Sequence, residues 1–324
     1  MVESKEEMIS RLSFSLMEEN YEVLIMQRDV FDVIAKKDNT LLLIKVLVNI
    51  DSYSQVCAEE LKKVAKMVNA VPIIIAEKGR NFVISDNIVY ERFNIPVVNL
   101  KTFINYLSRK EKLLVHSKKG KNVIYINAEK MKKLREKTEM SMSELAKKVN
   151  VTKKTIYFIE KEGKGSESVV RKIEDYFNED LALEIDLINW RFEEKIKDDF
   201  IQEKAENSNN ILIKVYKSLR EKGLECYTLR KTPADILSTP EREKEKLGDE
   251  LIACKLKEGF YNKKKLKMFK KFSEFCTLKK FILAKDRMRK VDNIMGIAVV
   301  DLKEIEEISD FPELVEIIEE RENK

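Results

Sequence analysis

The sequence predicts a mixed fold, with an all-α block between two α/β domains. Strand and helix patterns alternate over about residues 1–108 and again over about 211–324, which is typical of α/β layers. Between them, about 127–178 shows only helical periodicity. The 324 residues also exceed what one small core needs, so two or three domains are expected.

Apolar runs and amphipathic segments define the first α/β block. Helices are expected at Lys5–Glu19, at Ala58–Val68 and at the end of Val97–Tyr106, which begins as a short strand. Strands are expected at Tyr21–Met26, Phe31–Ala35, Leu41–Val48 and Val71–Ala76. A basic connector then leads to an alternating strand at Asn122–Ile126.

The last block repeats the element pattern of the first. A long helix, Leu181–Lys204, and a polar linker, Ala205–Asn210, are expected to precede it. Its expected elements are helix Ile211–Lys222, strands Ala234–Leu237 and Leu251–Leu256, helix Lys263–Phe275, strands Phe281–Ala284 and Ile294–Val300, and helix Pro312–Glu320. We therefore expect an internal repeat, with domains 1–122, 123–180 and 211–324 and a connecting segment 181–210.

Composition argues against several classes of function. The four cysteines have no C-x-x-C spacing and the only histidine is His116, which we expect to be exposed; a zinc site and a catalytic triad are therefore not expected. We expect no metal and no cofactor. No apolar run reaches the ~18 residues of a membrane span, and the start MVESKEEMIS lacks a signal-type core. We expect an intracellular, cytoplasmic protein with no membrane partner.

Basic charge is concentrated in the helical block. Between Ala128 and Gly165, ten lysines and one arginine stand against six glutamates, so this segment carries a charge equal to the +5 of the whole chain. A concentration of positive charge suits a polyanionic partner, although a lysine-rich face can also be simply solvated.

Capping residues divide this block into four short helices. Asn127 precedes the first, Ser141-x-x-Glu144 forms a capping box for the second, and Thr152 precedes the third. Gly163 is expected to end the third helix and Ser166 to cap the fourth, with a loop at Lys161–Gly165 that is one residue longer than usual.

The run SMSELAKKVNVTKKTIYFIE, Ser141 to Glu160, resembles the helix-turn-helix signature of the Cro and lambda-repressor family. The resemblance implies that the third helix enters the major groove of duplex DNA. The implied DNA-binding residues are Ser141, Met142, Thr152, Lys153, Lys154, Thr155, Tyr157, Phe158, Lys161 and Lys164. Lys118, Lys119 and Lys121 could add phosphate contacts. Met142 and Phe158 stand where polar readers are common in the family, which predicts weak sequence specificity.

A second pattern resembles the metal site of restriction-endonuclease-like domains, in which an aspartate precedes an acid-x-lysine strand. Asp32 with Lys45, and Asp235 with Lys255, follow this pattern, but Leu43 and Ala253 stand where the second acid belongs. One carboxylate is a poor Mg²⁺ site, so we expect nuclease-like domains without activity. A plain α/β domain remains the alternative.

The whole layout resembles an archaeal family of helix-turn-helix transcriptional regulatory proteins. Val30-Phe31-Asp32, Gly120, Leu134-Arg135-Glu136 and the Ser141–Glu160 run carry the resemblance. It implies a transcriptional regulator. Helix-turn-helix domains of this type usually read two half-sites, so we expect a homodimer that binds double-stranded DNA, and we do not expect an enzyme. The alternatives are a DNA-targeted metal-dependent nuclease, and an antitoxin or scaffold protein whose helical domain binds protein. The operator and any effector are not revealed.

Overall fold

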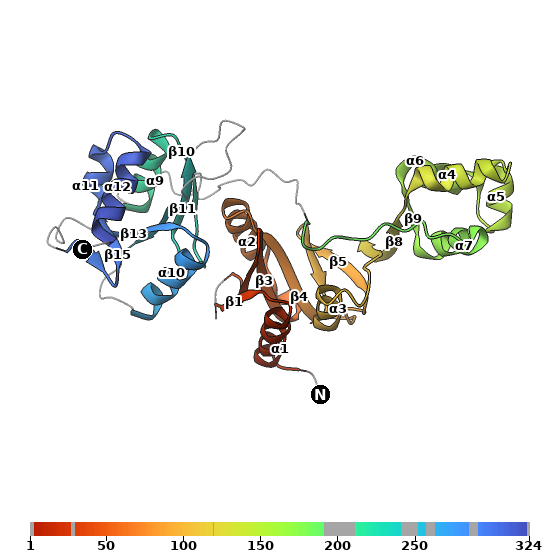
Figure 1. Cartoon of the computed structure of the whole chain (residues 1–324), viewed down its shortest axis with the longest axis horizontal. Coiled ribbons are helices and arrows are strands. Elements are labelled where there is room, and N and C mark those ends of the chain that lie inside the picture. The colour runs from red at the N-terminus through yellow and green to blue at the C-terminus, as the bar shows by residue number, and fades with distance from the viewer. Residues whose placement is uncertain are drawn as a thin grey trace. The chain divides into compact units, whose positions relative to one another are not determined.

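The computed structural model describes residues 3–26, 30–118, 120–190, 211–240, 252–256, 263–284 and 291–322, with the backbone alone for Lys118 and for 252–256 (Figure 1). These residues group into two compact units. Unit 1 comprises Met1–Val23, Ile44–Tyr53 and Pro72–Phe192, and unit 2 comprises Leu24–Leu43, Ser54–Val71 and Glu193–Lys324.

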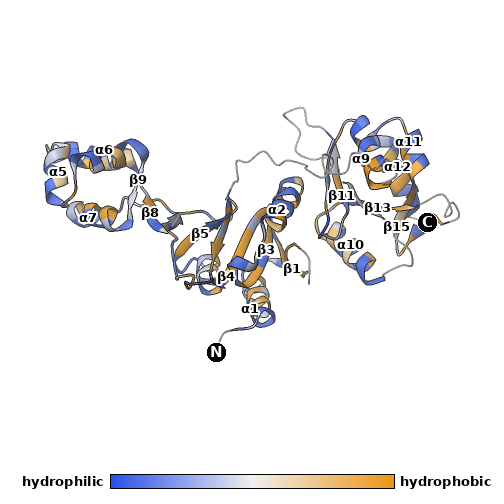
Figure 2. Cartoon of the chain, turned by 180° about the vertical axis from the view of Figure 1, so that it is seen from behind, coloured by the Kyte–Doolittle hydropathy of each residue, from blue (hydrophilic) through white to orange (hydrophobic). Residues whose placement is uncertain are grey.

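The first α/β region is built from short capped helices and apolar strands. Its elements are α1 (Lys5–Glu18), β1 (Glu22–Ile25), β2 (Val33–Lys37), β3 (Thr40–Asn49), α2 (Gln55–Met67), β4 (Val71–Lys78), β5 (Ile88–Arg92), β6 (Ile95–Val98) and α3 (Leu100–Leu107). Ser4, Ser54 and Asn99 cap the three helices through their side chains. Strands β3 and β4 read as nearly continuous apolar runs and are mostly hydrophobic in Figure 2, as expected of strands covered on both faces.

The helical block is joined to this sheet by three further strands. They are β7 (Val115–Lys118), β8 (Lys121–Tyr125) and β9 (Lys164–Ser166), and the helices are α4 (Ala128–Lys137), α5 (Met142–Lys148), α6 (Lys153–Glu162) and α7 (Glu167–Phe177). The nine strands run in the order β1-β2-β3-β4-β6-β5-β7-β8-β9. Because β9 lies between α6 and α7 and pairs with β8, it connects the helices to the edge of the sheet.

The last α/β region forms a separate six-stranded sheet. Its elements are α9 (Ile211–Glu221), β10 (Leu224–Thr228), β11 (Ile236–Pro240), β12 (Ile252–Leu256), α10 (Lys263–Phe275), β13 (Lys279–Ala284), β14 (Asn293–Ile294), β15 (Ile297–Asp301), α11 (Leu302–Glu307) and α12 (Phe311–Glu322). The strand order is β10-β11-β12-β13-β15-β14, with β13 parallel to β12 and β15. The first six strands of the nine-stranded sheet follow the same path, including a final antiparallel pair, β5 with β6.

Within unit 2, α2 is tied to the loop before β11. The buried carboxylate of Glu60 accepts hydrogen bonds from the backbone N–H groups of Arg230 (2.9 Å) and Lys231 (3.0 Å). The backbone N–H of Val30 donates to the carbonyl oxygen of Lys231 at 3.1 Å. These hydrogen bonds join residues of the first α/β region to a loop of the last α/β region, so they connect segments that are far apart in the sequence.

The expected helix Leu181–Lys204 is wrong where the structure describes it. Residues 181–190 are not helical. The backbone N–H of Leu183 donates to Tyr125 at 2.8 Å and that of Ile185 donates to Leu113 at 2.7 Å, so these donors are unavailable for helical bonding. The remainder of that helix and the linker Ala205–Asn210 lie outside the described residues.

Three smaller expectations also need correction. His116 is buried, with its ring 5.7 Å from that of Trp190, so it is not an exposed residue. The Lys161–Gly165 loop is shorter than expected, because β9 begins at Lys164. Ser166 stands at the N-cap position of α7 but makes no side-chain capping bond.

Candidate nucleic-acid interface

The four helices α4–α7 enclose a small apolar core. Leu145 and Ala146 of α5 face Ile156 and Ile159 of α6, and all four are buried. The backbone N–H of Val151 donates to the carbonyl oxygen of Ala146 at 2.9 Å, which closes the turn between the two helices. The small Ala146 side chain suits this close contact, since a larger one would have to displace α6.

Polar caps fix where α5 and α6 begin. The predicted capping box is confirmed, because the Ser141 hydroxyl accepts from Glu144 N–H at 3.2 Å and the Glu144 carboxylate accepts from Ser141 N–H at 2.8 Å. Hydrogen bonds from the Ser141 backbone and side chain lower the pKa of Glu144. At α6, the Thr152 hydroxyl accepts from Thr155 N–H at 3.1 Å, and the two threonine hydroxyls lie 2.9 Å apart.

A buried ion pair, which the sequence analysis missed, holds α6 against α4. Arg135 Nε donates to Glu160 Oε1 at 2.7 Å and Arg135 Nη2 donates to Oε2 at 3.2 Å. Arg135 Nη1 also donates to the carbonyl oxygen of Met140 at 2.9 Å. Hydrogen bonding to Glu160 raises the pKa of Arg135. Arg135 lies four residues after the buried Met131, and Glu160 four after the buried Ile156, a spacing that could have revealed the pair.

The opposite face of α6 exposes lysines and aromatic rings. Lys153 and Lys154 are exposed at its N-terminus, and Tyr157 and Phe158 are 45% and 40% exposed. The rings of Tyr157 and Phe158 lie 5.6 Å apart, edge to face. Lys154 Nζ lies 5.7 Å from the Phe158 ring centroid, and Lys161 Nζ lies 5.7 Å from that of Tyr157. Cation–π attraction thus favours positions of the two ammonium groups beside the rings.

The other predicted DNA-binding residues differ in accessibility. Ser141 and Thr152 are exposed, while Thr155 is half-buried. Met142 is half-buried and packs against the core of the helical block. Lys164 is exposed but pairs with Glu162 at 3.0 Å. A phosphate at Lys164 would therefore have to compete with this carboxylate.

Of the three predicted phosphate contacts, the structure places one side chain. Lys121 is exposed at the start of β8. Lys118 lies on β7, where only its backbone is described, and Lys119 lies outside the described residues. Lys118 and Lys121 are register partners across the β7–β8 hairpin.

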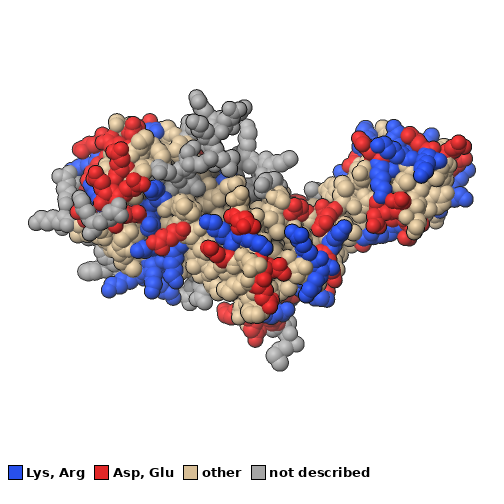
Figure 3. All heavy atoms as spheres, in the orientation of Figure 1, with Lys and Arg blue, Asp and Glu red and all other residues tan. Residues whose placement is uncertain are grey.

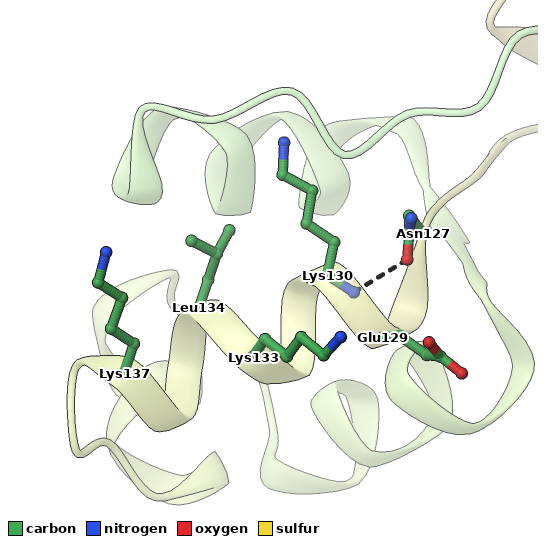
Figure 4. A pocket seen from close by; sticks show the side chains of 6 residues that line it. All are labelled: Asn127, Glu129, Lys130, Lys133, Leu134 and Lys137. Atoms are coloured by element: carbon green, nitrogen blue, oxygen red, sulfur yellow. Dashed lines mark hydrogen bonds between the residues drawn. The ribbon is translucent and has the colours of Figure 1, made fainter.

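A shallow hollow lies along α4, away from the exposed residues of α6. Asn127, Glu129, Lys130, Lys133, Leu134 and Lys137 line it (Figure 4). Lys130 Nζ donates to the carbonyl oxygen of Asp180 and pairs with Glu179, both at 2.8 Å. Lys133 and Lys137 are exposed. The hollow takes no residue from α6, so its lysines provide a comparison for those on α6.

The nuclease-like residues occupy matching positions in the two sheets. Asp32 directly precedes β2 and is 1% exposed, and Asp235 directly precedes β11. Lys45 is half-buried on β3, and Lys255 lies on β12, where side chains are not described. Leu43 is fully buried where a second acid would stand. Among the described residues, no group of three or more His, Cys, Asp or Glu side chains is arranged to hold a metal.

Within the part of the chain that the structure describes, no helix is both long and apolar enough to cross a membrane.

Two family models match the chain. Residues 5–113 match a PD-(D/E)XK superfamily domain, and residues 131–183 match a helix-turn-helix domain. The first match covers Asp32 and the strand that carries Lys45, and the second covers α5 and α6. The N-terminal region is thus restriction-endonuclease-like, and a helix-turn-helix domain follows it, as the sequence predicted.

Relatives along most of the chain come from archaea. A protein of Methanococcus maripaludis is 31% identical over 300 residues, covering 91% of each chain. A protein of Archaeoglobus fulgidus is 29% identical and covers 88% of each, and one of Pyrococcus furiosus is 29% identical and covers 90% of this chain and 89% of its own. On this similarity, the chain belongs to the archaeal family whose members are named "Putative HTH-type transcriptional regulatory protein".

Proposed function

We propose that this protein is a transcriptional regulator that reads duplex DNA by placing α6 in the major groove. The observation that carries the proposal is the set of exposed side chains on α6, Lys153, Lys154 and Tyr157, on a helix whose other face is braced by Arg135 and Glu160. A braced helix can present these groups in one geometry, which is what groove recognition needs.

Each exposed group has a complementary partner on DNA. A lysine at the start of α6 can donate to guanine O6 and N7 or to a phosphate. The Phe158 ring can contact a thymine methyl group, since apolar side chains read that group in the major groove. Met142, packed against the core, offers no polar reader at the start of α5. We therefore expect high affinity at low salt and modest discrimination between sequences.

The remaining assignments are part of the same proposal. Lys118, Lys119 and Lys121 would contact phosphates beside the site. Two copies of the chain would bind two half-sites, the usual arrangement for helix-turn-helix regulators. The α/β regions would serve as a scaffold without nuclease activity, in a cytoplasmic protein.

Neutralising the two lysines at the start of α6 tests the proposal. K153Q/K154Q should bind a duplex selected from random sequence more weakly than the wild type. The slope of log affinity against log salt concentration should fall by about 2, since each lysine releases about one counterion. The measurement is fluorescence anisotropy over a range of salt concentrations.

The matched control removes the same charge from the α4 hollow. K133Q/K137Q should keep most of the affinity and the preference for the selected duplex. Equal losses in both variants would reduce the effect to net charge and contradict the placement of α6. Failure of the wild type to bind any duplex at low salt would favour the protein-binding alternative.

A further inference from the structure

The last α/β region is strongly polarised in charge. Helix α10 carries six lysines and one glutamate, whereas the segment 302–322, which contains α11 and α12, has nine acidic residues and two basic ones. Figure 3 shows the lysine side chains gathered over α10 and the acidic side chains gathered over α11 and α12. Outside the helical block the total charge is close to zero, and this total conceals the separation of positive and negative charge within the last α/β region.

The two charged surfaces lie on opposite faces of the sheet. Phe281, Leu283, Ala298 and Val300 share a core cluster with residues of α9, α11 and α12. Alternate strand residues point to opposite faces, so the buried Ile282 points the other way. Helix α10 contacts β13 with its own apolar side, which includes Leu266, Phe269 and Phe272. Figure 1 shows α10 across the sheet from the other three helices.

Three lysines form an exposed stripe along α10. Lys264, Lys267 and Lys271 follow the i, i+3, i+7 spacing of one helix face and span about 10 Å. None of the three has an ion pair or hydrogen bond with any residue that the structure describes. Nearby lysines do: Lys270 pairs with Glu274 at 3.8 Å, and Lys280 pairs with Glu322 at 3.0 Å.

The helix at the same place in the first α/β region lacks such a stripe. Helix α2 also lies between the third and fourth strands of its region, but its Lys62 and Lys63 are buried. Its Lys66 donates to Glu225 at 2.8 Å. The lysine stripe is therefore not a by-product of this architecture, which forms around α2 without one.

We propose that the stripe Lys264–Lys267–Lys271 on α10 binds the phosphate backbone of duplex DNA, as a second contact that is independent of sequence. The inference rests on the proposed function, because α6 in the same chain is what brings duplex DNA to the protein. Lysine ammonium groups bind phosphates as point charges, and contacts to phosphates carry no sequence information. The acidic surface of α11 and α12 repels a polyanion, so of these two faces the α10 face is the one that attracts it.

Neutralising the stripe in the full chain tests the proposal. K264Q/K267Q/K271Q should weaken binding to a selected duplex and to an unrelated duplex by the same factor. The slope of log affinity against log salt concentration should fall by about 2 to 3. By contrast, K153Q/K154Q should reduce the preference for the selected duplex. Glutamine keeps the helix propensity, and circular dichroism checks that the fold is retained.

The matched control removes three charges from the other face of the same sheet. K214Q/K217Q/K222Q changes two exposed lysines of α9 and the lysine that follows it, and should leave the salt slope unchanged. The inference is wrong if the salt slope of the α10 variant is unchanged, or if the control variant changes it equally. The proposed function survives either result as long as the wild type still binds DNA through α6. If the α10 variant loses binding to phosphatidylserine vesicles but binds DNA as the wild type does, the stripe binds a membrane surface instead of DNA. A wild type that binds no duplex overturns both proposals.

Discussion

The Arg135–Glu160 pair is the residue-level feature on which the geometry of α6 depends most. Both side chains are largely buried and share two hydrogen bonds, so removing the Glu160 charge leaves Arg135 with only the Met140 carbonyl oxygen and the exposed Glu136 nearby. Removing one member of a buried ion pair typically lowers the free energy of unfolding by about 3 kcal/mol. This is far more than the intact pair contributes relative to two apolar side chains in its place.

We therefore predict that Glu160→Gln loosens α4 and α6. Amide hydrogen exchange in these helices should become about 100-fold faster, the equivalent of that free energy in local opening. The matched control is Glu136→Gln, since Glu136 lies 3.8 Å from the same arginine but is exposed. Its effect should stay below about 1 kcal/mol. Similar exchange rates in the two variants would mean that the buried pair does not hold the helices together.

Asp186 provides a residue-level test through pH. Partial burial raises the pKa of Asp186, but hydrogen bonds from Asn189, Tyr106 and Ile188 outweigh this, so the pKa lies below its usual value of 3.8. Tyr106 Oη donates to Asp186 at 3.0 Å, and Asn189 Nδ2 donates at 2.7 Å. A carboxylate with a lowered folded-state pKa stabilises the fold above the unfolded pKa, and this contribution is lost as pH falls through the folded pKa.

Asp186→Asn should consequently lower stability at pH 6 by less than about 1 kcal/mol, because Asp186 is exposed and solvent weakens its hydrogen bonds. The difference from the wild type should shrink as the pH falls from 3.8 through the lower pKa of the folded carboxyl, since the wild-type side chain also becomes neutral there. Trp190, the only tryptophan, lies four residues away and donates to the carbonyl oxygen of Asn94 at 3.3 Å. Urea titration followed by its fluorescence measures the local transition. A difference that stays constant down to pH 3 would contradict the assignment.

At the scale of elements, the sequence predicted best where caps and periodicity agreed. Helix α10 has the bounds that were expected, Lys263–Phe275, and α4 and α6 begin after the predicted caps Asn127 and Thr152. These features depend on neighbours within four residues, so they can be identified without knowledge of the tertiary fold.

Elements defined by distant partners were missed or wrong. The segment 181–190 contains helix-forming residues, yet the Glu174 carboxylate accepts from the N–H groups of Leu181 and Ala182, both at 2.8 Å. Strand β9 has three residues, including Gly165, and exists because β8 lies beside it. The same limit applied to the site: the resemblance to the helix-turn-helix signature implied the DNA-facing residues of α6, but Arg135 and Glu160 meet only in the folded chain.

At the scale of the whole molecule, the six-stranded sheet and the first six strands of the nine-stranded sheet carry an aspartate and a lysine at matching positions. Asp32 and Asp235 each precede the second strand of their sheet, and Lys45 and Lys255 each lie on the third. The match of residues 5–113 to a PD-(D/E)XK domain makes this more than a coincidence of residue types. It also makes metal-dependent cleavage the main rival to a purely regulatory role.

The missing second carboxylate leads us to predict that the protein does not cut DNA. In the restriction-endonuclease-like metal site two carboxylates hold Mg²⁺, and one carboxylate alone is a poor site for it. Leu43 is buried on β3, two residues before Lys45, so Asp32 is the only carboxylate of the motif. Supercoiled plasmid incubated with the full chain and Mg²⁺ or Mn²⁺ should remain unnicked, and Asp32→Ala should behave as the wild type. Asp235→Ala is the matched variant in the second sheet. A metal-dependent nick that Asp32→Ala abolishes and Asp235→Ala preserves would make the first α/β region a working nuclease that the helix-turn-helix domain directs to its target.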